Sequence, residues 1–157
     1  MRYLSTRGEA PALDFEAVLL AGLAEDGGLY LPESWPRFDA AAQAALRGLS
    51  YPELARAIVA PFIGDAVPGP ALDAMLRAAY AGFDDPAVVP MREIEPGLHV
   101  MELFHGPTLA FKDVALQLVG RLFDHALAKR GRRITIVGAT SGDTGSAAIE
   151  ACRDRDA

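Results

Sequence analysis

A lysine beside an aspartate, Lys112 and Asp113, stands between a short apolar loop and a long segment of apolar residues at helical spacing. The dipole of a helix disfavours a lysine at its amino end by up to about 1 kcal/mol. One interpretation is an amine held at the mouth of a pocket, where it can form an imine with a carbonyl cofactor. The other is a surface lysine whose neighbour Asp113 caps the first helical turn. These residues alone leave both interpretations open.

A second group of chemically useful residues is the loop "GATSGDTGS" at 138–146. Its glycines permit tight turns, and Thr140, Ser141 and Thr144 place hydroxyl groups before a predicted helix, an arrangement that can hold a carboxylate or a phosphate. The loop lacks both the lysine of a P-loop and the glycine spacing of a dinucleotide-binding fingerprint. A plain helix-capping turn, with Ser141 or Asp143 bonded to backbone amides, would explain the same residues.

The elements around these two groups predict that they share a pocket. A predicted strand at 98–103 precedes a predicted helix, whose apolar residues from 111 to 127 recur at i, i+3, i+4 and i+7. A short apolar strand is then predicted at 133–137, and another helix at 146–153. This order is a βαβ unit with one more helix. If the strands are parallel, the loops after their carboxyl ends lie at one edge of the sheet, so Lys112 should face the glycine-rich loop.

The first half of the chain has the pattern of short helices. Asp14 is a candidate N-cap of the first helix, which we expect to end at Gly27 and Gly28. An extended connector with two prolines at 29–36 separates it from a helix that begins with a capping box at Ser50. A further helix is predicted at 70–83.

The pattern changes near residues 82–88 to short β-branched runs, which marks a domain boundary. We therefore expect a small, mostly helical N-terminal domain at 1–84 and the start of an open, largely parallel α/β sheet domain at 85–157. Within the second domain, Pro96 and Gly97 suit a type II turn between two strands.

Composition limits the classes of partner. The 157 residues are 51% hydrophobic and 23% charged, with a net charge of −6, which argues against nucleic acid as a partner. The single cysteine, Cys152, excludes an internal disulfide and fits a reducing compartment. The start of the chain lacks the apolar core of a signal peptide, and no apolar run is long enough for a membrane span, so we expect a cytoplasmic protein without a membrane partner. The three histidines lack metal-ligand spacing, so no metal site is expected.

Three stretches of the sequence together resemble one family. They are "YLSTRGEAP" with "GLAEDGGLYLPESWP", then "LFHGPTLAFKDVALQ", then "GATSGDTGSAA", and they occur in the order found in threonine synthase. This family belongs to the fold-type II pyridoxal phosphate enzymes, whose sheet domain is similar to that of the tryptophan synthase β subunit. The resemblance covers nearly the whole chain, and it implies the domain arrangement expected above.

The resemblance implies roles for the two groups of residues. Lys112 would carry pyridoxal 5'-phosphate as a Schiff base, with Phe111 and Asp113 on either side of it. The loop at 140–145 would surround the substrate carboxylate and approach the cofactor ring. The implied cofactor-binding residues are Lys112, Phe111 and Asp143, and the implied substrate-binding residues are Thr140, Ser141, Gly142 and Thr144. Many fold-type II relatives have Asn at the position of Asp143, whereas the threonine synthases that this chain resembles have Asp. A carboxylate cannot donate a hydrogen bond as Asn can.

The implied activity is that of a lyase in threonine biosynthesis, which converts O-phospho-L-homoserine and water to L-threonine and phosphate. The chain stops at "CRDRDA", before the family's glycine-rich loop for the cofactor phosphate and before the group that faces the pyridine nitrogen. We therefore expect an N-terminal part of such an enzyme, inactive without its C-terminal part. The alternative is a non-catalytic module related to the family, which binds a phosphorylated small molecule or a partner.

Overall fold

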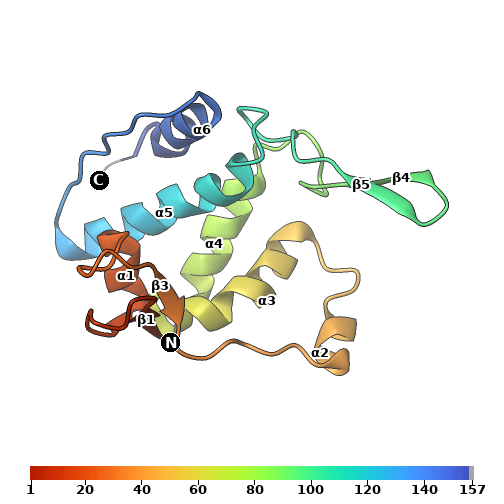
Figure 1. Ribbon diagram of the computed structural model, residues 1–157. Helices are drawn as coiled ribbons and strands as arrows, with labels where there is room; N and C mark the ends of the chain where they lie inside the picture. The colour runs from red at the N-terminus through yellow and green to blue at the C-terminus, as the bar shows by residue number, and fades with distance from the viewer. Residues whose placement is uncertain (156–157) are drawn as a thin grey trace. The chain divides into compact units, whose positions relative to one another are not determined.

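A computed structural model describes residues 1–155, and the chain forms two compact units (Figure 1). Unit 1 consists of Met1–Leu49 and Glu53–Leu72. Unit 2 consists of Ser50–Pro52 and the residues from Asp73 onward. Both units contain helices and strands, so the chain has a mixed helix and sheet fold. No helix of residues 1–155 is long and apolar enough to cross a membrane.

Unit 1 contains a three-stranded antiparallel sheet in the order β2-β1-β3. The central strand β1 (Arg2–Ser5) pairs with β2 (Leu13–Asp14) and with β3 (Tyr30–Pro32). Tyr3 and Ser5 of β1 are buried. The sequence did not predict this sheet, and the connector expected at 29–36 contains β3. Strands of two to four residues are too short for an alternating pattern to identify them.

The helices of unit 1 begin where capping residues predict and end less predictably. Asp14 is the N-cap of α1 (Phe15–Ala21) and accepts a hydrogen bond of 2.8 Å from the amide of Ala17. The helix ends at Gly22, with φ +69°, so the end expected at Gly27 and Gly28 is wrong. The earlier glycine already supplies the positive φ that a helix end favours. The remaining elements are α2 (Ala40–Ala45), α3 (Tyr51–Ile63), η1 (Gly64–Ala66) and the start of α4 (Gly69–Tyr80).

One carboxylate, that of Asp26, holds the loops of unit 1 together. It accepts hydrogen bonds from the Ser5 hydroxyl and from the amides of Glu9, Ala10 and Gly28, at 2.7 to 3.1 Å. Partial burial raises the pKa of Asp26, but these hydrogen bonds to the charged form outweigh it and lower the pKa to about 2. Asp26 is therefore ionised wherever the protein is folded near neutral pH.

In unit 2, α5 (Asp113–Arg130) packs on α6 (Asp143–Cys152), and the two helices lie side by side in Figure 1. A Cβ atom on Gly120 would lie 2.5 Å from the carbonyl oxygen of Ala151, so the close approach of the helices requires glycine there. The left-handed Gly131 ends α5, as the sequence predicts. The buried apolar residues of this pair are Leu118, Leu122, Ala126 and Leu127 of α5, and Ala147 and Ala151 of α6.

The carboxyl half of α4 also belongs to unit 2 and is joined to α5 by Tyr80. The Tyr80 hydroxyl donates to the carbonyl oxygen of Val114 over 3.2 Å, and its ring makes an edge contact of 4.8 Å with Tyr51. Burial, followed by the proximity of Tyr51, raises the pKa of Tyr80. Tyr80 therefore stays protonated and keeps its hydrogen bond to the first turn of α5.

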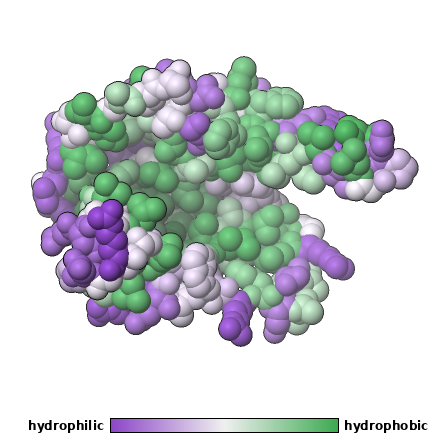
Figure 2. All heavy atoms as spheres, in the orientation of Figure 1, coloured by the Kyte–Doolittle hydropathy of each residue, from purple (hydrophilic) through white to green (hydrophobic). Residues whose placement is uncertain are grey.

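The two strands of unit 2 form an antiparallel hairpin, β4 (Met91–Glu95) and β5 (Leu98–Met101), around the turn predicted at Pro96 and Gly97. Gly97 has φ +80°, as a type II turn requires. All residues of both strands are exposed, including five large apolar side chains. Figure 2 shows apolar and polar atoms side by side on the surface of this hairpin. A two-stranded ribbon is only marginally stable by itself.

The strand expected at 133–137 is not formed. Residues 131–140 are exposed, and Ile136 and Val137 are 56% and 91% exposed. Both sheets of residues 1–155 are antiparallel, so the described chain does not contain the parallel strand pair that the βαβ interpretation predicts. The helices on either side of this segment are formed as expected. A strand needs a hydrogen-bonding neighbour, and the described residues offer none to this segment.

Candidate active site

Lys112 lies at the amino end of α5, as the apolar spacing predicts. Its backbone has helical angles, φ −66° and ψ −21°, and its carbonyl oxygen accepts a hydrogen bond of 2.9 Å from the amide of Leu116. The amine lies 4.2 Å from the centre of the Phe111 ring, which is a cation–π contact. The side chain is half-buried. Lys112 is therefore neither a core residue nor a freely exposed surface lysine.

Asp113 does not cap the helix in the way considered above. Its carboxylate accepts hydrogen bonds of 2.8 Å from the amide and from the hydroxyl group of Thr108, in the loop before the helix. The side chain is completely buried. Asp113 therefore connects the first turn of α5 to the preceding loop.

Lys112 and the glycine-rich loop share a cavity of about 450 Å³. The cavity is lined by Leu103, Phe111, Lys112, Val114, Ala115, Leu116 and Thr144. Its volume lies within the range of roughly 300 to 1,000 Å³ found for small-molecule sites. Thr144 is in the first turn of α6, so the expected shared pocket exists. The ends of two packed helices form it, rather than the edge of a parallel sheet.

The turn before α6 is held by Thr140. The Thr140 hydroxyl oxygen accepts hydrogen bonds from the amides of Gly142 and Gly145, at 3.1 and 3.0 Å. Thr140 thus has the capping role for which the sequence offered Ser141 or Asp143 as the alternative interpretation of this loop. Its hydroxyl proton remains able to donate to a ligand. The side chains of Thr140, Ser141 and Asp143, like Gly142, are exposed and are not among the residues that line the cavity.

The sequence interpretation missed the apolar walls of this cavity. Ala115 and Leu116 follow Lys112 by three and four residues, so they share its face of the helix. That spacing is a signal from which both could have been found. Leu103 follows β5 and offers no comparable signal, because only the folded loop brings it to the cavity.

A polar cluster fixes the chain between β5 and the Lys112 loop. The ring of His105 pairs with Glu102 at 2.7 Å, and Glu102 also accepts a hydrogen bond of 3.0 Å from Arg92 of β4. The hydrogen bond with His105, followed by the charge of Arg92, lowers the pKa of Glu102. His105 is not among the residues that line the cavity. Its function in this structure is to support the loop.

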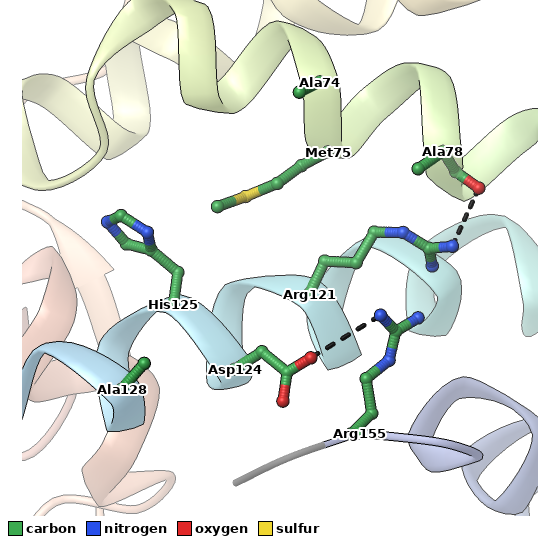
Figure 3. Close-up of a pocket in the computed structure, with 8 residues that line it drawn as sticks. All are labelled: Ala74, Met75, Ala78, Arg121, Asp124, His125, Ala128 and Arg155. Atoms are coloured by element: carbon green, nitrogen blue, oxygen red, sulfur yellow. Dashed lines mark hydrogen bonds and ion pairs between the residues drawn. The ribbon is translucent and has the colours of Figure 1, made fainter. Parts of the chain in front are cut away.

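A second cavity of about 440 Å³, lined by Arg121, His125 and Arg155 among others, lies on another face of α5 (Figure 3). Arg121 donates to the carbonyl oxygens of Gln117 and Ala78, at 2.6 and 2.8 Å, and Arg155 pairs with Asp124 at 3.5 Å. These arginines are thus engaged in joining α4, α5 and the chain after α6, which disfavours this cavity as an anion site. Within residues 1–155, no group of three or more His, Cys, Asp or Glu side chains could hold a metal ion.

Comparison with known protein families gives a match over half of the chain. Residues 2–80 match the family model described as the threonine synthase N terminus. Among curated proteins, the chain is similar to the threonine synthase of Pseudomonas aeruginosa, with 58% identity over 156 residues, which are 99% of this chain and 33% of the relative. It is also similar to threonine synthase-like 2 of Homo sapiens, with 43% identity over 96% of this chain and 31% of the relative.

Solved structures give the same result. The chain is similar to PLP-bound threonine synthase from Brucella melitensis, with a TM-score of 0.97 and 58% identity, over 99% of this chain and 34% of that one. It is also similar to the threonine synthase of yeast, with a TM-score of 0.90 and 42% identity, over 99% and 33% of the two chains. The chain thus spans about a third of the length of its relatives.

Proposed function

Because this chain belongs to the threonine synthase family, we propose that it forms the lysine-bearing part of a pyridoxal phosphate-dependent lyase. The reaction is the conversion of O-phospho-L-homoserine and water to L-threonine and phosphate. The chain corresponds to about a third of its relatives, so we assign this activity to the assembled protein, with the remaining two thirds as its partner. The chain alone is expected to have no turnover.

The observation that carries this proposal is the shared cavity of about 450 Å³. Lys112 enters it from the amino end of α5 and Thr144 from the amino end of α6, although 32 positions separate them in the sequence. An amine, an apolar wall and a hydroxyl-bearing turn are the features that a carbonyl cofactor and an amino-acid substrate need.

The residues of this cavity fit the cofactor. Lys112 would hold its carbonyl carbon through the amine, and Phe111 would lie beside it, since their side chains are already in contact. When bound, the cofactor supplies a store for the electrons that leave the substrate's α-carbon. Freed when the substrate's own amine takes its place on the cofactor's carbonyl carbon, the amine of Lys112 would act as a base and an acid that moves protons between substrate carbons. The apolar side chains of Leu103, Val114 and Leu116 line the cavity beside this amine and would limit its contact with water in the assembled protein.

We assign substrate binding to the turn before α6. The hydroxyl groups of Thr140, Ser141 and Thr144 and the backbone at Gly142 would bind the substrate carboxylate, because a helix amino end with hydroxyl donors favours an anion. Asp143 would face the cofactor. Thr140 is already fixed by two backbone amides, which supports a turn that is formed before the substrate arrives.

We also propose the finer organisation of the chain. A domain boundary after residue 84 is supported by the family match, which ends at residue 80. In the assembled protein, residues 133–137 would become a strand of an open, largely parallel sheet. The apolar side chains exposed along that segment support this, because a sheet neighbour would cover them.

The experiment is a chimera in which this chain replaces the matching third of the Pseudomonas aeruginosa threonine synthase. We expect the chimera to release phosphate from O-phospho-L-homoserine and to show the visible absorption of bound pyridoxal phosphate. Lys112→Ala should lower kcat by at least about a hundredfold, which is the lower end of the loss for a positioned acid–base group.

Lys129→Ala is the matched control, since Lys129 is an exposed lysine at the other end of the same helix. It should leave kcat unchanged. The proposal is overturned if the chimera has the circular dichroism of the parent enzyme but neither binds the cofactor nor turns over. Full activity in the Lys112→Ala chimera would also overturn it.

A further inference from the structure

The buried carboxylate of Asp113 is the feature of unit 2 that the proposed chemistry leaves without a function. Asp113 follows Lys112 directly, and none of its surface is exposed. Within residues 1–155, its carboxylate bonds only to Thr108, and no cationic side chain pairs with it. A buried carboxyl group without a cationic partner is costly unless hydrogen bonds satisfy its oxygens, and here Thr108 supplies those bonds. An apolar side chain could fill the same space more cheaply.

The backbone of the loop between Thr108 and Lys112 is strained, and it needs contacts that hold it in place. Leu109 has φ +62°, a left-handed conformation that is strained for a side chain of this size, and its amide donates to the carbonyl oxygen of Gly106 over 3.0 Å. Strained residues persist only where the surrounding contacts hold them in place. Thr108 and Asp113 lie on either side of Leu109 in the sequence, and the two hydrogen bonds that Thr108 donates to Asp113 hold the loop between them in one conformation.

Gly106 shows that the contact is close. A Cβ atom at this position would lie 2.5 Å from the Cβ atom and 2.6 Å from a carboxylate oxygen of Asp113. Gly106 is buried, so a larger residue would have to displace either the carboxylate or the turn. The strained backbone at Leu109 and the close packing of Gly106 therefore both involve the side chain of Asp113.

We propose that Asp113 and Thr108 form a latch that positions the amine of Lys112 for the reaction. The latch fixes Lys112 from the loop side, and the hydrogen bond from Leu116 to its carbonyl oxygen fixes it from the helix side. The inference rests on the proposed function, because it gives Asp113 the task of positioning a lysine that binds the cofactor. Asp113 acts through Lys112 and does not itself contact the reacting atoms.

The test uses the chimera described above and compares substitutions that keep or break the latch. Asp113→Asn keeps the shape of the side chain. Its oxygen can accept from the Thr108 amide and its NH2 group can donate to the Thr108 hydroxyl oxygen, so kcat should stay within about threefold of wild type. Asp113→Ala removes both bonds, and kcat should fall by about a hundredfold, as expected for a reacting group misplaced by about 1 Å. The KM for O-phospho-L-homoserine should change far less, since the substrate-binding turn is not altered.

Two further variants keep the test decisive if Asp113→Ala fails to fold. Thr108→Val removes only the hydroxyl bond and should lower kcat by about tenfold, and Thr108→Ser should restore it, because it returns the hydroxyl. Asp124→Ala is the matched control, because it is the same substitution on the same helix and Asp124 does not line the cavity of Lys112. It should leave kcat unchanged.

The outcomes separate this inference from the proposed function. A wild-type chimera that neither binds pyridoxal phosphate nor turns over sinks the proposed function. An active wild-type chimera in which Asp113→Ala, or Thr108→Val, keeps the wild-type kcat overturns the latch alone. A fall in kcat in the valine variant that serine does not restore also counts against the latch.

Discussion

The two loops that lead into α5 and α6 differ in how they are held, although both contribute to one cavity. The loop at 103–112 has internal backbone hydrogen bonds, a buried glycine and the buried carboxylate of Asp113. The loop at 132–142 is exposed throughout, and among residues 1–155 its main support is the Thr140 hydroxyl. The difference teaches that the loop before Lys112 is fixed by buried contacts, whereas residues 133–139, which lead to the turn at Thr140, have no backbone hydrogen-bond partner among residues 1–155.

The largest expected difference is in hydrogen exchange of the isolated chain. The amides of Thr108 and Asp113 donate hydrogen bonds within the first loop, whereas those of Thr135, Ile136 and Val137 have no backbone partner among residues 1–155. We expect the second group to exchange at least about a hundredfold faster, which corresponds to about 2.7 kcal/mol. Mass spectrometry of the fragments would measure this. Equal protection would contradict the comparison.

Gly120→Ala should weaken the attachment of α6 to α5. The added methyl group would meet the carbonyl oxygen of Ala151, and overpacking of this kind costs about 1 to 3 kcal/mol. Urea unfolding would measure the loss of stability, and hydrogen exchange should increase in α6 more than in the first turn of α5. Gly82→Ala is the control, because its Cβ atom would meet nothing within 4 Å.

Thr140→Val should loosen only the second loop. The amides of Gly142 and Gly145 lose their acceptor, and the loss of a capping side chain costs about 1 kcal/mol. Nuclear magnetic resonance would show faster exchange of these two amides, with no change at Thr108. Thr140→Ser keeps the hydroxyl and should behave as wild type. Faster exchange at Thr108 as well would show that the two loops are coupled.

The smallest effect is expected from the pH dependence of Glu102, which precedes the first loop and pairs with its His105. The pKa of Glu102 in the folded protein is below its ordinary value of 4.5, so Glu102 stabilises the fold above that value, and this contribution is lost as the pH falls through the lower, folded value. Its partner Arg92 is exposed, which keeps the contribution small. Unfolding measured from about pH 6 to about pH 3 should show a smaller acid loss in Glu102→Gln than in wild type. Equal slopes would exclude this contribution.

Local patterns in the sequence predicted the parts of the chain whose structure depends on nearby residues. The cap at Asp14, the turn at Gly97, the long helix behind Lys112 and its end at Gly131 all follow from side chains within a few positions. The resemblance of three short stretches was sufficient to indicate the family, and the match to residues 2–80 confirmed it. The placement of Lys112 at a helix amino end was likewise predicted.

Only the tertiary structure decided which residues meet across the chain. The sheet of β1 to β3 pairs segments of two to four residues that are too short to recognise, and residues 133–137 form no strand despite their β-branched residues, because pairing requires a neighbour. The burial of Asp113 against Gly106 and the shared cavity of Lys112 and Thr144 also depend on contacts between packed elements. The sequence by itself determined which residues could do chemistry, and packing decided which of them face one another.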